Sequence, residues 1–322
     1  MSTMILGSIM ALSSSNWVYV WMGLELNLLS FIPVMSSSSN LQETESAVKY
    51  FIVQTIGSGI LMVTAMMVLN SSMFSLNQSV YTSIMCLSIM LKLGAAPTHW
   101  WLPHVMSGMS WMNCMILATW QKLAPIMLAM SSITCLNPIT VVLFSTMSAI
   151  VGGMGGMNQT QLRTILAYSS IGHLGWMLMA TISSLSISIL YFSVYCAINI
   201  SIMFLMNKTS QLKSVMNFSI MNMPNSSFMS LSFLLMSLGG LPPLLGFAPK
   251  WMVFMTTMDS LLLIPMLVLI VGSLMNLFYY LSMVFNFTLS QNKPWHSNTA
   301  SSPLLSSILM TISGPLFLVV TM

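Results

Sequence analysis

The amino-acid sequence predicts an all-α polytopic membrane protein with about eleven transmembrane helices, on three observations. First, 56% of its 322 residues are hydrophobic and only 4% are charged, whereas about a quarter of the residues of a soluble protein carry charge. Second, apolar segments follow one another with short connections. Third, glycine and proline interrupt two of these segments. No long polar stretch remains, so we expect no soluble domain and no nucleotide, flavin or iron–sulfur cluster on this chain.

Polar residues, glycine and proline bound each hydrophobic segment. In chain order the segments cover about 3–12, 17–35, 47–69, 80–106, 113–134, 139–154, 164–182, 187–206, 226–258, 261–289 and 303–321. Since one bilayer crossing requires roughly 20 apolar residues, the first segment is short. The fourth and ninth are long because each contains an interruption.

Both interruptions combine residues that weaken a helix: Gly94 and Pro97 in the fourth segment, and Gly239, Gly240, Pro242 and Pro243 in the ninth. Non-helical backbone at membrane depth is tolerated where it is buried in protein or lines a wet cavity. The two segments lie five apart in the count, so they cross the membrane in opposite directions. This spacing predicts an inverted repeat of two five-helix units, residues 1–135 and 136–289, followed by a loop and a C-terminal helix at 290–322. A proline kink used only for packing is the alternative for either break taken alone.

Basic residues predict the orientation of the chain. Successive connections lie alternately on the two sides of the membrane. On this basis five basic residues fall on the side of the N-terminus: Lys49, Arg163, Lys208, Lys213 and Lys293. By the positive-inside rule the N-terminus faces the matrix or cytoplasm, and the C-terminus faces the opposite side. The net charge of +4 is spread too thinly to form a nucleic-acid surface.

Four ionisable residues lie inside apolar sequence: Glu25, Lys92, Lys122 and Lys250. A charge at membrane depth costs between ~2.5 and ~17 kcal/mol, so such residues face a polar interior or a partner. Together they suggest an ion or proton path. We expect no metal site, because no ligand cluster is evident, and the four cysteines are interpreted as packing residues.

The four residues have different expected roles. Charge matching pairs Glu25 with Lys92, either as a gate that opens when Lys92 changes partner or as a static salt bridge. Lys122 lies mid-span with no carboxylate in its own segment. Because burial disfavours the charged form of a lysine, we expect Lys122 to gain and lose protons. Lys250 follows the second break, where it is either an exit-side proton group or a lysine that extends to the surface.

Two further residues are secondary candidates. His173 lies within the seventh segment, where it is either a proton relay or a hydrogen-bonded structural histidine. Lys49, with Glu43 and Glu45 nearby, is expected to anchor the third segment at the membrane edge.

Several motifs in the chain are specific to one family: Gly23–Glu25, Lys92–Pro97, Thr119–Pro125, Met154–Arg163, Ala167–His173 and Gly239–Phe247. They are spread along most of the sequence. On these motifs the chain resembles the antiporter-like chain 2 family of membrane subunits of mitochondrial NADH:ubiquinone oxidoreductase, respiratory complex I, in a short animal form. The 37 methionines are consistent with an invertebrate mitochondrial code.

The resemblance implies an antiporter-like fold and a proton-pumping, non-redox subunit of the inner mitochondrial membrane. In that family the residues matching Glu25, Lys92, Lys122 and Lys250 form a central polar axis. It implies no cofactor in this chain, with NADH, FMN, iron–sulfur clusters and ubiquinone on other subunits. The implied partners are a neighbouring antiporter-like subunit, a small subunit nearer the quinone site, and phospholipid.

The chain departs from the family's pattern at three positions, which hold Thr98, His104 and Thr164. The family often has an acidic residue where His104 stands. The resemblance therefore does not support a matrix-side proton entry route through that position. Two other functions share the same features. One is a free-standing cation/proton antiporter, and the other is a structural spacer whose charges serve only as internal polar packing.

Overall fold

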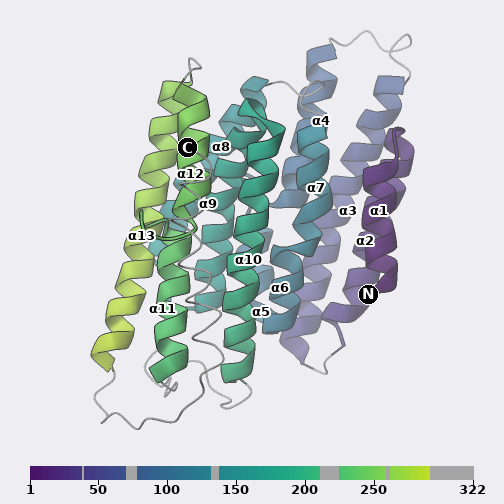
Figure 1. Ribbon diagram of the computed structural model, residues 1–322. Coiled ribbons are helices and arrows are strands. Elements are labelled where there is room, and N and C mark those ends of the chain that lie inside the picture. The colour runs from purple at the N-terminus through teal and green to yellow at the C-terminus, as the bar shows by residue number, and fades with distance from the viewer. Residues whose placement is uncertain (38–39, 70–77, 132–137, 211–224, 259–261, 291–322) are drawn as a thin grey trace. The chain divides into compact units, whose positions relative to one another are not determined.

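The computed structural model describes residues 1–37, 40–69, 78–131, 138–210, 225–258 and 262–290, whose regular structure is entirely helical (Figure 1). The helices are α1 (Ser2–Ser13), α2 (Trp17–Met35), α3 (Leu41–Leu69), α4 (Gln78–Leu93), α5 (Trp101–Gly108), α6 (Trp111–Ala118), α7 (Trp120–Ser131), α8 (Pro138–Met157), α9 (Leu162–Ser183), α10 (Leu185–Ser210), α11 (Asn225–Gly239), α12 (Phe247–Met258) and α13 (Leu263–Ser290). The predicted all-α membrane fold is confirmed in this part of the chain. The eleventh expected segment, 303–321, lies outside the described residues.

Seven helical stretches in the described ranges are long and apolar enough to cross a membrane. Three shorter apolar helices cover Ser2–Ser13, Val80–Leu93 and Ser227–Gly239. The last two are short because each is the first half of a broken helix. Outward-facing side chains are large and apolar, for example Leu29 of α2 and Phe278 of α13.

The chain divides into two compact units, Met1–Ser148 and Ala149–Met322. Compactness does not test whether the halves are inverted copies, so the repeat with its boundary after residue 135 stays a prediction.

In the first unit, α1 packs closely on α2 at two glycines. A Cβ atom on Gly23 would lie 2.9 Å from Cα of Ala11, and one on Gly7 would lie 2.8 Å from the backbone nitrogen of Asn27. Small residues allow such close approach of two helix backbones. Helix α3 packs against α2, α4 and α5, and α7 packs against α4 and α6.

In the second unit, α9 is the most buried of the candidate spans, with 89% of its apolar window inside the protein. It contacts α10, α12 and α13. Gly172 of α9 lies against Gly152 of α8, where an added Cβ would come within 2.7 Å of Gly172 Cα. A helix with polar residues such as His173 is thus surrounded by other helices rather than exposed to lipid.

The fifth expected segment, 113–134, corresponds to the stretch Trp111–Ser131, which is long and apolar enough to cross a membrane. The structure interrupts it at Thr119, between α6 and α7, where the Thr119 hydroxyl donates to the Met115 carbonyl at 2.7 Å. Pro125 lies inside α7 and cannot donate a backbone hydrogen bond to Gln121, which loosens the helix on the N-terminal side of the proline.

Candidate functional site

The first break begins where α4 ends at Leu93. Gly94 has a φ of +74°, and the backbone N–H groups of Gly94 and Ala95 donate to the carbonyls of Leu91 (3.2 Å) and Met90 (3.0 Å). This is a Schellman motif, in which a residue in the left-handed region closes the helix. The non-helical segment continues to Trp100, beyond the Pro97 that the sequence indicated.

Two neutral side chains donate to the last carbonyls of α4. Gln54 Nε2 of α3 donates to the Lys92 carbonyl at 3.2 Å, and Trp101 Nε1 of α5 donates to the Leu91 carbonyl at 3.1 Å. Buried carbonyls at a helix end require such partners. The capping donors therefore come from outside the α4 helix, and the Lys92 ammonium is not used as a cap.

The second break has the same backbone motif. Helix α11 ends at Gly239, Gly240 has a φ of +83°, and the N–H groups of Gly240 and Leu241 donate to Ser237 (3.1 Å) and Met236 (3.5 Å). The non-helical segment runs to Gly246, longer than the Gly239–Pro243 interruption that was predicted.

At this break the lysine itself is the cap. Lys250 of α12 is 7% exposed, and its Nζ donates to the Gly239 carbonyl at 2.9 Å. A Cβ on Gly240 would lie 2.7 Å from Nζ, so the ammonium sits directly against the break. This burial disfavours the alternative in which Lys250 extends to the surface.

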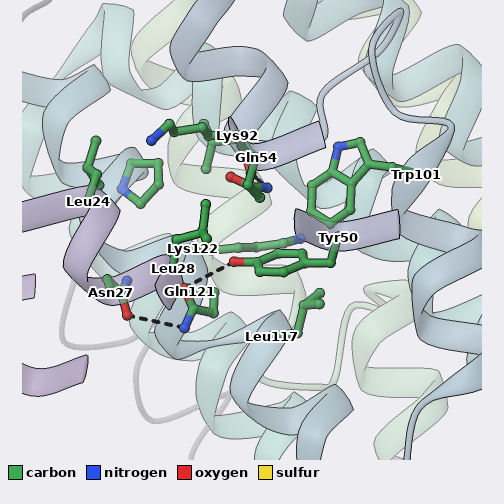
Figure 2. A pocket seen from close by; sticks show the side chains of 12 residues that line it. Leu24, Asn27, Leu28, Tyr50, Gln54, Lys92, Trp101, Leu117, Gln121 and Lys122 are labelled. Carbon is green, nitrogen blue, oxygen red and sulfur yellow. Dashed lines mark hydrogen bonds between the residues drawn. The ribbon is translucent and has the colours of Figure 1, made fainter. Parts of the chain in front are cut away.

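Lys92 and Lys122 line one cavity in the first unit (Figure 2). They are 6% and 3% exposed, and they enter the cavity from α4 and α7. Its volume of about 20 Å³ gives room for about one water molecule. The lining residues, contributed by α2 to α7, are Leu24, Asn27, Leu28, Tyr50, Gln54, Lys92, Leu93, Trp101, Leu117, Gln121, Lys122 and Pro125.

Glu25 lies on α2 next to the cavity-lining Leu24, and its side chain is half-buried. Charge matching made it the expected partner of Lys92. Within the described residues, however, the two groups do not come within the 4.0 Å of an ion pair. Oε2 of Glu25 is buried without a hydrogen-bond partner in the same part of the chain. Glu25 and Lys92 therefore form no ion pair in this structure, and the switchable pair stays a prediction.

A chain of neutral polar groups beside Lys122 was not predicted. Tyr50 donates to Gln121 Oε1 at 3.4 Å, and Gln121 Nε2 donates to Asn27 Oδ1 at 3.2 Å. The sequence signal that could have indicated these residues is that each polar side chain lies inside an apolar segment. Their pairing was not readable, because Gln121 is 94 residues from Asn27 and 71 from Tyr50.

The secondary candidates have different surroundings. His173 of α9 is 4% exposed, its Nδ1 lies 2.9 Å from the Tyr191 hydroxyl, and its ring lies 5.4 Å from that of Tyr195. Lys49 is half-exposed on α3 and pairs with Glu45 one turn earlier at 2.6 Å. His173 and Lys250 belong to the second unit and the other candidates to the first.

Comparison with known proteins identifies related chains. The family model described as "NADH:quinone oxidoreductase/Mrp antiporter, TM" matches residues 14–278. A protein named NADH-ubiquinone oxidoreductase chain 2, from Lumbricus terrestris, is 44% identical over 287 residues, which are 89% of this chain and 85% of the relative.

Solved structures share the fold at low sequence identity. A chain of respiratory complex I from Thermus thermophilus superposes with a TM-score of 0.80 at 19% identity, covering 98% of this chain and 76% of that chain. A chain of the Mrp complex from Dietzia sp. gives a TM-score of 0.78 at 15% identity, covering 98% and 74%. The antiporter-like fold expected from the sequence is therefore confirmed.

Proposed function

The chain belongs to the NADH:quinone oxidoreductase/Mrp antiporter family, among its NADH-ubiquinone oxidoreductase chain 2 members, and we propose that it is a proton-translocating subunit in the membrane arm of that oxidoreductase. Quinone reduction on other subunits drives charge movements along the arm, and this subunit converts them into proton transfer. The observation that carries the proposal is the shared cavity of Lys92 and Lys122.

The cavity supplies the elements of a proton switch. Both lysine side chains line one small cavity, so a change in the charge of one alters the electrostatic field at the other. Glu25 of α2 is the carboxyl group expected to pair with Lys92. When Lys92 moves toward or away from Glu25, the field at Lys122 changes, and with it the proton affinity of Lys122. Lys122 is thus the titrating site, and Glu25 with Lys92 forms the pair that controls it.

Lys250 takes part in proton release or in coupling to the next subunit. Its hydrogen bond to the Gly239 carbonyl supports this role, because a transferable proton is held beside non-helical backbone. His173 and its hydroxyl neighbour Tyr191 are a secondary relay.

The remaining assignments follow from family membership. We propose that the chain carries no redox centre, and that NADH, FMN, iron–sulfur clusters and ubiquinone are bound by other subunits. Its partners are a neighbouring antiporter-like subunit, a small subunit nearer the quinone site, and phospholipid. It lies in the inner mitochondrial membrane with its N-terminus toward the matrix, as the positions of the basic residues support.

The variant Lys122→Met tests the function in the assembled oxidoreductase. Methionine keeps much of the side-chain volume but cannot carry a proton. NADH-driven proton pumping is expected to be lost while the amount of assembled complex is unchanged. Lys208→Met is the matched control, since Lys208 is exposed and lies over the ring of Phe204. A wild-type number of protons per NADH in Lys122→Met would refute the proposal, and the same result after neutralising both Lys92 and Lys122 would establish a structural spacer.

Cation/proton antiport by the separate chain is a second candidate, favoured by the structural likeness to the Mrp complex. It predicts ion exchange in vesicles containing this subunit alone. The 44% identity to an NADH-ubiquinone oxidoreductase chain favours the first function. Purification of the subunit within a large assembly, with no exchange activity of its own, would decide for the oxidoreductase.

A further inference from the structure

The polar chain along the cavity wall has a defined direction. The Tyr50 hydroxyl points to Gln121, and the Gln121 amide points to Asn27, as Figure 2 shows. The three residues come from α3, α7 and α2, and all of them line the cavity that Lys92 and Lys122 share. The cavity therefore presents neutral hydrogen-bonding groups beside its two amines.

The two bonds of this chain differ in strength. The Gln121–Asn27 distance of 3.2 Å is within the usual range for an N–H donor, and Gln121 Nε2 also lies 3.5 Å from Met4 Sδ of α1. The Tyr50–Gln121 distance of 3.4 Å is long for an O–H donor, whose usual distance is about 2.7–2.8 Å. The amide is thus anchored, whereas the hydroxyl is held weakly and can turn to another acceptor at small cost.

The ring that carries this hydroxyl is fixed. Tyr50 is 3% exposed, and its ring packs edge-on against Phe31 at 5.5 Å and at a tilt against Trp101 at 5.7 Å between ring centroids. The oxygen is therefore held at one place on the cavity wall. Rotation about the C–O bond redirects the hydroxyl proton between Gln121 and the cavity without moving the ring.

A tyrosine hydroxyl can connect two lysine amines in a proton transfer. A charged lysine only donates hydrogen bonds, so its proton leaves only to an acceptor, whereas a tyrosine hydroxyl both accepts and donates. The cavity has space for about one water beside it. We propose that the Tyr50 hydroxyl relays protons between Lys92 and Lys122, with that water connecting it to Lys92, and that Gln121 positions it.

The relay step conserves atoms and charge. As one protonated amine, or a water it has protonated, forms an O–H bond with the Tyr50 oxygen, the original Tyr50 O–H bond breaks toward the other amine or its water. The first amine becomes neutral, the second becomes charged, and Tyr50 is neutral before and after. Rotation of the hydroxyl back to Gln121 Oε1 resets the direction of transfer. This inference rests on the proposed function and adds a residue that connects its two lysines.

The first test replaces Tyr50 by phenylalanine in the assembled oxidoreductase. NADH-driven pumping is expected to slow by on the order of 10- to 100-fold, because a positioned proton-transfer group contributes about a hundred-fold and a water takes over part of its role. The slowing of pumping in D₂O should increase, because proton transfer becomes rate-limiting. The matched control is Tyr81→Phe on α4, where the buried hydroxyl has no hydrogen-bond partner within the described residues. Tyr81→Phe should pump as wild type.

The second test uses Gln121→Met, which keeps the side-chain length and removes the acceptor for Tyr50. It should slow pumping as well, and it tests the inference on its own if Tyr50→Phe fails to assemble. The double variant should be no slower than the slower single variant, because both changes break one chain. Losses that multiply would show that the two residues act independently and would overturn the positioning role of Gln121.

The outcomes separate this inference from the function on which it rests. If Lys122→Met stops pumping but Tyr50→Phe behaves as Tyr81→Phe does, in rate and in the D₂O effect, the relay is refuted and the function stands. If Lys122→Met itself pumps at the wild-type ratio, the proposed function fails and the relay with it.

Discussion

At both breaks the first half-helix ends in a Schellman motif with glycine in the left-handed region, at Gly94 after α4 and at Gly240 after α11. The side chains around the two motifs are arranged differently. At the first break Gln54 and Trp101 donate to the last carbonyls. At the second, the Lys250 ammonium donates to the Gly239 carbonyl.

This difference assigns different tasks to the two lysines. Because neutral groups cap α4, the Lys92 ammonium is left to line the cavity with Lys122. Lys250 instead lies at the carboxyl end of α11, where the helix dipole is negative and attracts a cation. A hydrogen bond from a charged group contributes about 1.5–3 kcal/mol and one from a neutral group about 0.5–1.5 kcal/mol, so loss of the Lys250 proton weakens its bond to Gly239 by roughly 1 kcal/mol. The first break thus presents an exchangeable charge, and the second holds an anchored one.

The largest expected effect comes from substitutions of Lys250, which separate its role as a helix cap from its proposed role in proton transfer. Lys250→Arg keeps a donor for the Gly239 carbonyl but cannot release its proton. The complex should therefore assemble, while NADH-driven pumping is lost. Lys250→Met should lose pumping and also destabilise the break by about 1–3 kcal/mol, since a buried carbonyl is left without its partner. Normal pumping in Lys250→Arg would show that Lys250 is a structural cap only.

An intermediate effect is expected from alanine at the two left-handed glycines. Each substitution should cost about 1–2 kcal/mol, because a side chain disfavours that backbone conformation. At Gly94 the nearest atom to the new Cβ is the end of Leu102, which can move, whereas at Gly240 it is Lys250 Nζ. Gly240→Ala should therefore be worse by a further ~1.5–3 kcal/mol.

Heat resistance of the purified complex, followed by the amount that stays assembled, measures this difference. Gly59→Ala is the control, because no atom lies within 4 Å of its added Cβ. Equal losses at Gly94 and Gly240 would mean that displacement of Lys250 carries no cost, contrary to an anchored charge.

The sequence predicted the positions of both breaks but not their chemistry. Glycine and proline at Gly94–Pro97 and Gly239–Pro243 indicate a local loss of helical hydrogen bonds. That loss depends only on residues that are adjacent in the sequence. The donors that replace those bonds come from other helices. Gln54 is 38 residues from the carbonyl that it caps. Such pairings depend on helix packing, which one sequence does not encode in a readable pattern.

The interruption at Thr119 shows the same limit on a smaller scale. The interruption contains no glycine. Pro125 follows six residues later, inside α7, and a proline at such a position often only kinks a helix that stays continuous. The buried charges were predicted because ionisable residues are costly in an apolar segment. Tyr50, Asn27 and Gln121 were not, because neutral polar residues are ordinary in helix interiors and only their convergence on one cavity gives them significance.

The smallest expected effect concerns the two neutral caps of α4. The Leu91 carbonyl accepts from both Trp101 and Gly94, so Trp101→Phe leaves it one donor and should cost about 0.5–1.5 kcal/mol. Gln54→Leu removes the donor to the Lys92 carbonyl and should cost about 1–3 kcal/mol.

Amide hydrogen exchange across the last turn of α4 measures both changes locally, since each bond stabilises that turn against opening. Faster exchange is expected in both variants, and more so in Gln54→Leu. The α11 end, which Lys250 caps, serves as the internal reference and should not change. If the α4 turn exchanges at the wild-type rate without Gln54, another donor replaces it. Lys92 itself is the ammonium nearest to that carbonyl along the chain, and its use as a cap would make the two breaks alike.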